Sequence, residues 1–135
     1  MAIVAIVCNS LGDQDRSALV YDMLLPHAES MVVAGMPAEV LNSVHGPLAL
    51  LAATLDRWDD AEAHHAADEA ANLRMGNRMW VINDRWEWGR VIAGRGRDGD
   101  AERAGELLAA CAAEAREVGM TRIETMATEL LATLG

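Results

Sequence analysis

The segment Trp58-Asp59-Asp60-Ala61 decides the predicted fold, because related segments stand at equal distances on either side of it. They are Asp15-Arg16-Ser17-Ala18 and Ala101-Glu102-Arg103-Ala104. Their last residues, Ala18, Ala61 and Ala104, are 43 positions apart each time. A fixed period of about 20–50 residues in a helical sequence is typical of stacked helical hairpins. The period therefore predicts a solenoid in which each hairpin buries its apolar face on its neighbour.

The composition predicts an all-α fold. Hydrophobic residues make up 52% of the 135-residue chain, there is no Phe, and there is one Tyr. The abundant Ala and Leu favour helix, and β-branched runs are scarce apart from Ile3–Val7. At this length we expect one domain, residues 1–135, with a core that needs neither metal nor disulfide.

The charge excludes several kinds of partner. The chain has 11 basic and 21 acidic residues, a formal net charge of −10. Such a surface disfavours nucleic acid, which needs basic groups to replace its counterions. It equally disfavours an anionic membrane. All basic residues are Arg, so lysine Schiff-base chemistry and a lysine-containing phosphate loop are excluded as well.

Compartment signals indicate a cytoplasmic protein. Cys8 and Cys111 lie in apolar helical contexts, so we expect buried free thiols, with a disulfide or redox pair as the alternative. No apolar run is long enough to span a membrane. The apolar start, Met1–Cys8, lacks the basic flank and cleavage site of a signal peptide. It looks like the second half of a helix, which leaves open whether the chain is a piece of a larger protein.

Turn signals divide the sequence into seven expected helices. Their ranges are about 2–11, 14–25, 37–55, 58–75, 79–93, 100–118 and 121–134. Gly46-Pro47 predicts a kink or short break in the third, and Asp100 is the expected N-cap of the sixth. Gly76 and Gly119 suit left-handed caps and also lie 43 residues apart. The predicted fold is therefore a right-handed superhelix of three hairpins, each with helices A and B, plus a closing helix.

Several further segments carry a likeness to a known kind of repeat. They are Leu11-Gly12-Asp13, Tyr21-Asp22-Met23-Leu24-Leu25-Pro26, Val32-Val33-Ala34-Gly35, Leu50-Leu51-Ala52-Ala53-Thr54-Leu55, Arg57-Trp58-Asp59-Asp60-Ala61-Glu62, Asn72-Leu73-Arg74-Met75-Gly76 and 95–119 with its ending Ala115-Arg116-Glu117-Val118-Gly119-Met120. On these segments the chain resembles the tetratricopeptide-like helical repeats. More closely, it is similar to the C-terminal repeat region of large bacterial signalling ATPases, which include multidomain transcriptional activators.

The resemblance implies a bacterial interaction or sensing surface that regulates an attached ATPase or transcription factor. The ATPase itself is absent from this chain, which has no Gly-rich phosphate loop. Two residues depart from the family pattern. His65 stands where the second B helix usually has a bulky aromatic residue, and Asp68 occupies a position that is usually small and apolar.

These departures supply the candidate catalytic residues. His65 and Asp68 share a helix face, and a carboxylate beside an imidazole suits general acid/base chemistry. His45 with Glu87 is a second such candidate pair. The alternative is a structural role, exposed or hydrogen-bonded across a helix interface. His64 with Asp68 and His65 with Glu69 are also spaced for a metal, but zinc needs three or four ligands, so we expect no metal and no cofactor.

The expected binding residues lie on the A helices, which line the concave face of such a solenoid. Tryptophan and arginine dominate binding hot spots. The six candidates are Asn42, His45, Trp80, Asp84, Arg85 and Trp88. For Trp80 and Trp88 the alternative is packing in the core between repeats, and for the polar residues it is simple solvation.

The sequence therefore predicts a non-catalytic module that binds a peptide, a partner protein or a small effector in its groove. The alternative is a small enzyme with a pocket inside the repeat, which uses one of the two imidazole–carboxylate pairs. Ile3 and Val7 leave the first helix with an apolar face that should pack on further repeats or on a second copy of the chain, as a homodimer.

Overall fold

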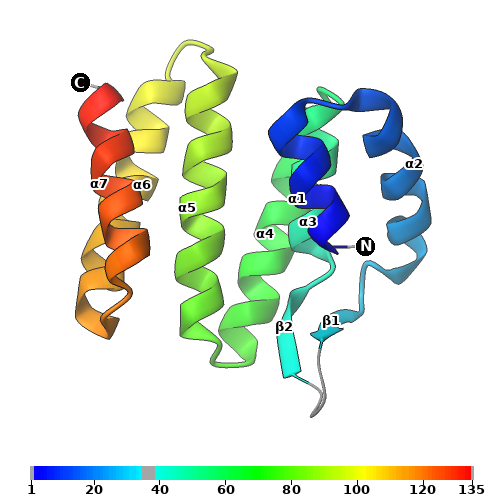
Figure 1. Cartoon of the computed structure of the whole chain (residues 1–135), viewed down its shortest axis with the longest axis horizontal. Coiled ribbons are helices and arrows are strands. Elements are labelled where there is room, and N and C mark those ends of the chain that lie inside the picture. Colours follow the sequence, from blue (N-terminus) through cyan, green and yellow to red (C-terminus); the bar gives the residue numbers. More distant parts are fainter. Residues whose placement is uncertain (1, 35–38, 135) are drawn as a thin grey trace. The chain divides into compact units, whose positions relative to one another are not determined.

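The computed structural model describes residues 2–34 and 39–134 of the chain, which fold almost entirely into helices (Figure 1). The helices are α1 (Ala2–Leu11), α2 (Gln14–Leu24), the short 3-10 helix η1 (Leu25–His27), α3 (His45–Thr54), α4 (Trp58–Arg74), α5 (Arg78–Arg95), α6 (Asp100–Val118) and α7 (Thr121–Leu134). Two short strands, β1 (Met31–Ala34) and β2 (Glu39–Ser43), precede α3. The chain divides into two compact units, Met1–Gly76 and Asn77–Gly135.

In the first unit, α3 is the central helix and packs against α1, α2 and α4. Its residues from Pro47 to Ala53 are all buried. A helix that is apolar all round must be covered on every side, so the sequence of α3 itself requires this central place. Asn9 of α1 donates from its side-chain amide to Leu50 O at 3.3 Å and to Thr54 Oγ1 at 3.0 Å.

The predicted third helix, 37–55, is wrong in its first half. β2 pairs antiparallel with β1, with Met31 opposite Ser43 and Val33 opposite Val40, and α3 begins only at His45. Valines on both strands suit a paired extended backbone better than a helix. Nor is there a kink at Gly46-Pro47. These residues lie in the first turn of α3, where a proline forfeits no intrahelical hydrogen bond.

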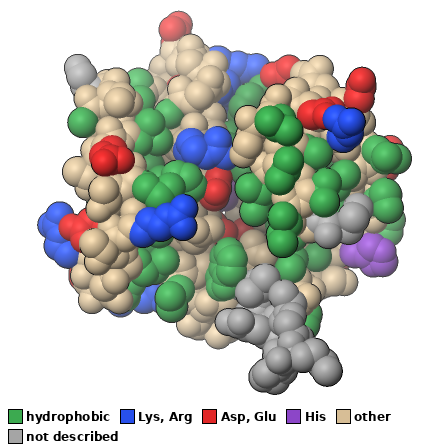
Figure 2. Space-filling view, viewed as in Figure 1, with side chains coloured by type: hydrophobic (Ala, Val, Ile, Leu, Met, Phe, Trp, Pro, Cys, Tyr) green, Lys and Arg blue, Asp and Glu red, His purple; other side chains and the backbone are tan. Residues whose placement is uncertain are grey.

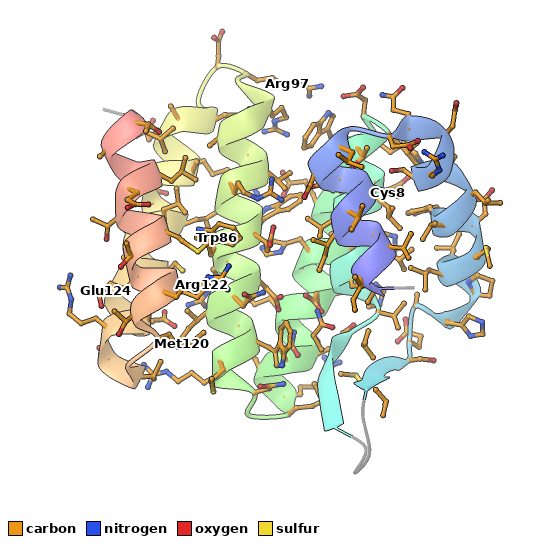
Figure 3. All side chains as sticks on the ribbon, viewed as in Figure 1. Cys8, Trp86, Arg97, Met120, Arg122 and Glu124 are labelled. Carbon is orange, nitrogen blue, oxygen red and sulfur yellow. The ribbon has the colours of Figure 1, made fainter. Side chains whose placement is uncertain are left out.

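In the second unit, α6 packs against both α5 and α7. The core cluster is Ile82, Leu108, Cys111, Ala112, Ala115 and Ala127. Trp86 of α5 packs against this cluster, and Figure 3 shows it on the side of α5 that faces α6 and α7. Gly89 allows α5 and α6 to approach closely, since a Cβ there would lie 2.8 Å from Leu108 Cγ. Cys8 and Cys111 are both free and buried, as expected.

The 43-residue period holds better for the second and third copies than for the first. Ala61 and Ala104 are fully buried, whereas Ala18 is exposed and its neighbour Ser17 takes the buried place on α2. Gly76 and Gly119 both have positive φ, at +68° and +76°, which confirms the left-handed caps. The second and third copies thus share the left-handed end of their second helix, and the buried position of the first copy is shifted by one residue.

The expected N-cap of α6 is wrong by one position. Asp100 is the first residue of the helix, and Gly99 takes the N-cap position with a positive φ of 83°. The Asp100 carboxylate instead accepts from the Arg97 amide at 2.8 Å and from Arg95 Nε at 2.7 Å. It therefore closes the loop before α6 rather than capping the helix.

Candidate functional site

A row of polar side chains runs along one face of α4. His64, Asp68 and Asn72 are spaced four residues apart and so lie one above another on the helix. Asp68 and Asn72 are buried and His64 is half-buried. An amphipathic helix normally presents apolar residues to its neighbours, so this α4 polar stripe (His64, Asp68, Asn72) needs partners.

His64 finds its partners on two other elements. Its Nε2 lies 2.9 Å from the hydroxyl of Tyr21 on α2. Its Nδ1 lies 2.9 Å from Nδ1 of His45, the first residue of α3. On the far side of His45, Nε2 faces the exposed carboxylate of Glu29 at 3.6 Å. The three side chains Tyr21, His64 and His45 form one hydrogen-bonded series, here called the imidazole chain.

The chemistry of its ends sets the direction of the imidazole chain. The negative charge of Glu29 favours a proton on the facing Nε2 of His45, which leaves His45 Nδ1 as an acceptor. His64 must then donate from Nδ1 and accept at Nε2 from the Tyr21 hydroxyl. In this arrangement each contact holds one proton, and all three side chains of the imidazole chain are electrically neutral.

The two rings meet end to end. Their centroids are 5.2 Å apart, which is close to the 2.9 Å between the nitrogens plus the two ring radii. The nitrogens therefore point almost directly at each other, as in an N–H···N hydrogen bond. Within residues 2–34 and 39–134 no group of three or more Cys, His, Asp or Glu side chains is placed to hold a metal.

Burial and nearby charge lower the pKa of His64. Desolvation is the largest cause, and the neighbouring His45 adds to it because two imidazolium charges would repel. Asp60 acts in the opposite direction, and Arg57 in the same direction as burial. Burial also raises the pKa of Tyr21, whose ring lies 4.5 Å beneath the Arg57 guanidinium. The neutral forms of both groups are therefore favoured.

One turn further along α4, Asp68 packs against the start of α3. A Cβ built on Gly46 would lie 2.8 Å from Asp68 Oδ2 and 2.9 Å from the amide nitrogen of Asn42. Asn72 donates to Asp68 Oδ1 at 3.3 Å. A carboxylate at a helix N-terminus is stabilised by the free N–H groups of the first turn and by the helix dipole. Asp68 therefore lies against the first turn of α3, where the N–H of His45 donates to Ser43 Oγ at 3.1 Å.

The six binding residues predicted from the sequence fall on different elements. Asn42 lies on β2 and His45 on α3, in the first unit, and the other four lie on α5 in the second. Asp84 and Trp88 are buried, whereas Trp80 and Arg85 are half-buried. Of the six, His45 is the one that enters the imidazole chain.

Two charged side chains of α5 that the sequence singled out, Arg85 and Glu87, are engaged in ion pairs within the second unit. Arg85 is paired with Glu114 of α6. Glu87, the predicted partner of His45, is bound by Arg90 of its own helix at 2.8 Å. Arg90 also lies over the Trp86 ring at 5.8 Å.

Sequence reasoning missed Tyr21 and His64 as partners, although the repeat contains the signal. The two residues are 43 positions apart. Their separation equals the 43-residue period of the alanine-marked segments. Applying the period to polar residues as well as to alanines would have paired them.

A second surface feature is the apolar face of α1. Ile3 and Leu11 are 77% and 74% exposed, and Val4, Ile6 and Val7 are exposed as well. The helix has no charged residue. Figure 2 shows hydrophobic side chains gathered over α1. None of the helices in the described part of the chain is both long and apolar enough to cross a membrane.

Comparison of the chain with protein-family models, with curated proteins and with solved structures finds no match.

Proposed function

We propose that the chain is a non-catalytic interaction module of tetratricopeptide-like helical hairpins, which binds a partner polypeptide through the apolar face of α1. The paired helices, the shared left-handed caps at Gly76 and Gly119 and the 43-residue period support this kind of repeat. The resemblance to regulatory repeat regions supports a role in signalling or transcription regulation. The alternative is binding through the residues that the sequence singled out, which are Asn42 and His45 in the first unit and Trp80, Asp84, Arg85 and Trp88 in the second.

One observation carries the choice of surface. Five apolar side chains of a ten-residue helix, Ile3, Val4, Ile6, Val7 and Leu11, are exposed to solvent. Each buried CH₂ contributes about 0.8 kcal/mol, so leaving this face uncovered forgoes several kcal/mol. Contiguous exposed apolar patches of this kind mark interaction sites in soluble proteins.

The chemistry of this face defines the partner. Ile3, Val7 and Leu11 follow each other at four-residue intervals and form a ridge along α1. Such a ridge fits the groove between side chains of another helix. Because two copies of a chain with a net charge of −10 repel each other, the uncharged helix is also the surface on which a second copy would meet the least repulsion.

The competing function is acid/base catalysis. For this function the imidazole chain is a better candidate than the two imidazole–carboxylate pairs predicted from the sequence, His65 with Asp68 and His45 with Glu87. Asp68, the predicted partner of His65, packs at the start of α3, and Glu87 is bound by Arg90. His45 and His64 are instead joined to Tyr21, a group that can pass a proton. An enzyme of this kind would lose its activity on substitution of His64.

The experiment compares the wild type with two arginine variants. Sedimentation velocity over a range of concentrations measures self-association, and a fluorescent helical peptide with an apolar four-residue stripe measures binding of another chain. Val7→Arg places a charge in the α1 face, and Leu73→Arg places the same charge on another exposed apolar residue, on α4.

We expect association or peptide binding for the wild type and for Leu73→Arg, with a loss of at least tenfold in Val7→Arg. A single buried and unpaired charge costs enough to produce such a loss. The proposal fails if the wild type binds neither itself nor the peptide, or if both arginine variants behave alike.

A further inference from the structure

We propose that the contact between His45 and His64 is an acid-operated latch, which holds one proton between its two imidazoles and opens when both become charged. The proposal concerns regulation within the first unit and does not depend on the function proposed for α1. It stands on the 2.9 Å distance between the two Nδ1 atoms and on the end-to-end arrangement of the rings.

The number of protons decides the state of the contact. With both imidazoles neutral, His64 Nδ1–H donates to His45 Nδ1 and Tyr21 donates to His64 Nε2. One added proton can enter at His64 Nε2, after which the Tyr21 oxygen accepts instead of donating. The contact between the rings survives this step, because one Nδ1 still carries a proton and the other does not. A second added proton places N–H groups on both Nδ1 atoms, and two donors cannot remain 2.9 Å apart.

The charges around the latch come from every element that packs on it. α2 contributes Tyr21, the residues before β1 contribute Glu29, and α3 contributes only His45 itself. Arg57 and Asp60 lie at the start of α4 and are bound to each other at 2.8 Å, so their charges largely cancel. Glu29 Oε1, at 3.6 Å from His45 Nε2, faces the proton that this nitrogen carries when the imidazole chain is neutral. A further carboxylate, the buried Asp68, lies one turn along α4 from His64 and packs against Gly46, next to His45.

The opening is local. His45 also binds through its backbone N–H to Ser43 Oγ at 3.1 Å, and Val44 N–H donates to Ser30 O at 3.1 Å. These bonds do not titrate, and the buried body of α3 from Pro47 to Ala53 contains no titratable group. The second proton therefore separates the first turn of α3 from the middle of α4 and leaves the rest of the unit folded. This is a switch between two arrangements of one junction.

The test is nuclear magnetic resonance of the ¹⁵N-labelled wild-type chain, which needs no variant that folds poorly. At pH 7.5 long-range ¹H–¹⁵N spectra should show the Nδ1–H form of His64 and the Nε2–H form of His45. A ¹⁵N–¹⁵N coupling across the hydrogen bond should join the two Nδ1 atoms. The same coupling should persist after the first proton is taken up and disappear with the second.

The backbone supplies the second readout. Amide signals of residues 43–46 and 61–68 should shift with the second protonation, while those of residues 47–53 stay in place. His64→Gln should abolish these acid-induced shifts, and the matched control His27→Gln, an exposed imidazole on η1, should keep them.

Three outcomes would overturn the proposal. The first is the Nε2–H form of both imidazoles without a coupling between their Nδ1 atoms. The second is double protonation without any shift of residues 43–46. The third is a Zn²⁺ titration at pH 7.5 that moves both Nδ1 resonances together, which would mean that the two nitrogens converge on an ion rather than share a proton.

Discussion

Replacing Gly46 by alanine tests the contact between α4 and the start of α3 more sharply than any other single substitution. The new Cβ would lie 2.8 Å from Asp68 Oδ2, 2.9 Å from Asn42 Nδ2 and 3.2 Å from Asp68 Cγ. The side chain of Asp68 is 1% exposed and is held by Asn72 at 3.3 Å, so it has little room to retreat.

Two opposing effects set the size of the change in stability. Overpacking a tight site costs roughly 1–3 kcal/mol. An unobstructed change from glycine to alanine in a helix stabilises by roughly 0.5–1 kcal/mol. Because the cost of overpacking exceeds this gain, we expect a net loss of about 1 kcal/mol, which lowers the Tm of a domain of this size by about 2–8 °C.

The assay is thermal and urea unfolding followed by circular dichroism. Gly105→Ala is the control, since Gly105 lies within α6 and a Cβ there meets nothing within 4 Å. It should raise the Tm. A double variant with Asn42→Ala, which removes one of the obstructing groups, should recover part of the loss from Gly46→Ala. If Gly46→Ala raises the Tm as Gly105→Ala does, the close packing of Asp68 on α3 is not as described.

Three further predictions concern other buried polar groups. Ser17→Ala should stabilise the chain by about 1 kcal/mol in urea unfolding, because the buried Ser17 hydroxyl has no hydrogen-bond partner among the described residues. The reverse change at the corresponding buried alanine, Ala61→Ser, should destabilise the chain. Equal effects of the two changes on stability would contradict this prediction. Asp100→Asn should lower stability at neutral pH, because the hydrogen bond from Arg95 lowers the pKa of Asp100 from 3.8 to about 2. Since the folded state favours the charged carboxylate, its contribution is present above pH 4 and is lost as the pH falls through 2, so the difference between variant and wild type should fade over that interval. The Cys111 thiol, whose pKa burial raises to about 11, should resist alkylation by iodoacetamide at pH 8 until the chain unfolds, and labelling of the native protein at the rate of a free thiol would be inconsistent with its burial.

The stability of the first unit should also depend on pH near neutrality. Burial lowers the pKa of His64 below its ordinary value of 6.5, so the folded state disfavours the charged imidazole. Its contribution to stability is therefore complete above pH 6.5 and is lost as the pH falls through the lowered value. Urea midpoints between pH 8 and 5 should decrease for the wild type and remain flatter for His64→Gln. Parallel curves for the two proteins would exclude His64 as the source.

The sequence was sufficient to predict all the long helices except the start of the third, because their signals are local. The ranges 2–11, 100–118 and 121–134 agree with α1, α6 and α7, and each is bounded by a glycine or another turn residue. The pairing of β1 with β2 was missed because a short apolar run suits a strand and a helix segment alike. Pro37 and the apolar residues after it resemble the start of a helix when each is considered alone.

The candidate site was harder to predict, since it depends on which face of α4 is buried. The sequence pointed to His65 as the unusual histidine, whereas His64 is the one directed at Tyr21 and His45. A rotation of one residue around a helix is about 100°, and helical spacing alone does not choose between neighbours. The spacing of 43 between Tyr21 and His64 would have favoured His64, because it equals the period of the alanine-marked segments.

The decisive experiment for the proposed binding face maps the bound partner on the chain. Unlabelled helical peptide, or the second copy if the chain self-associates, is added to ¹⁵N-labelled protein, and the amide shifts are followed by residue. We expect changes along α1, from Ala2 to Leu11, that Val7→Arg abolishes and Leu73→Arg does not. Amide shift changes confined to Trp80–Trp88 of α5, with α1 unaffected, would contradict the proposal. They would favour binding through the residues of α5 that the sequence predicted.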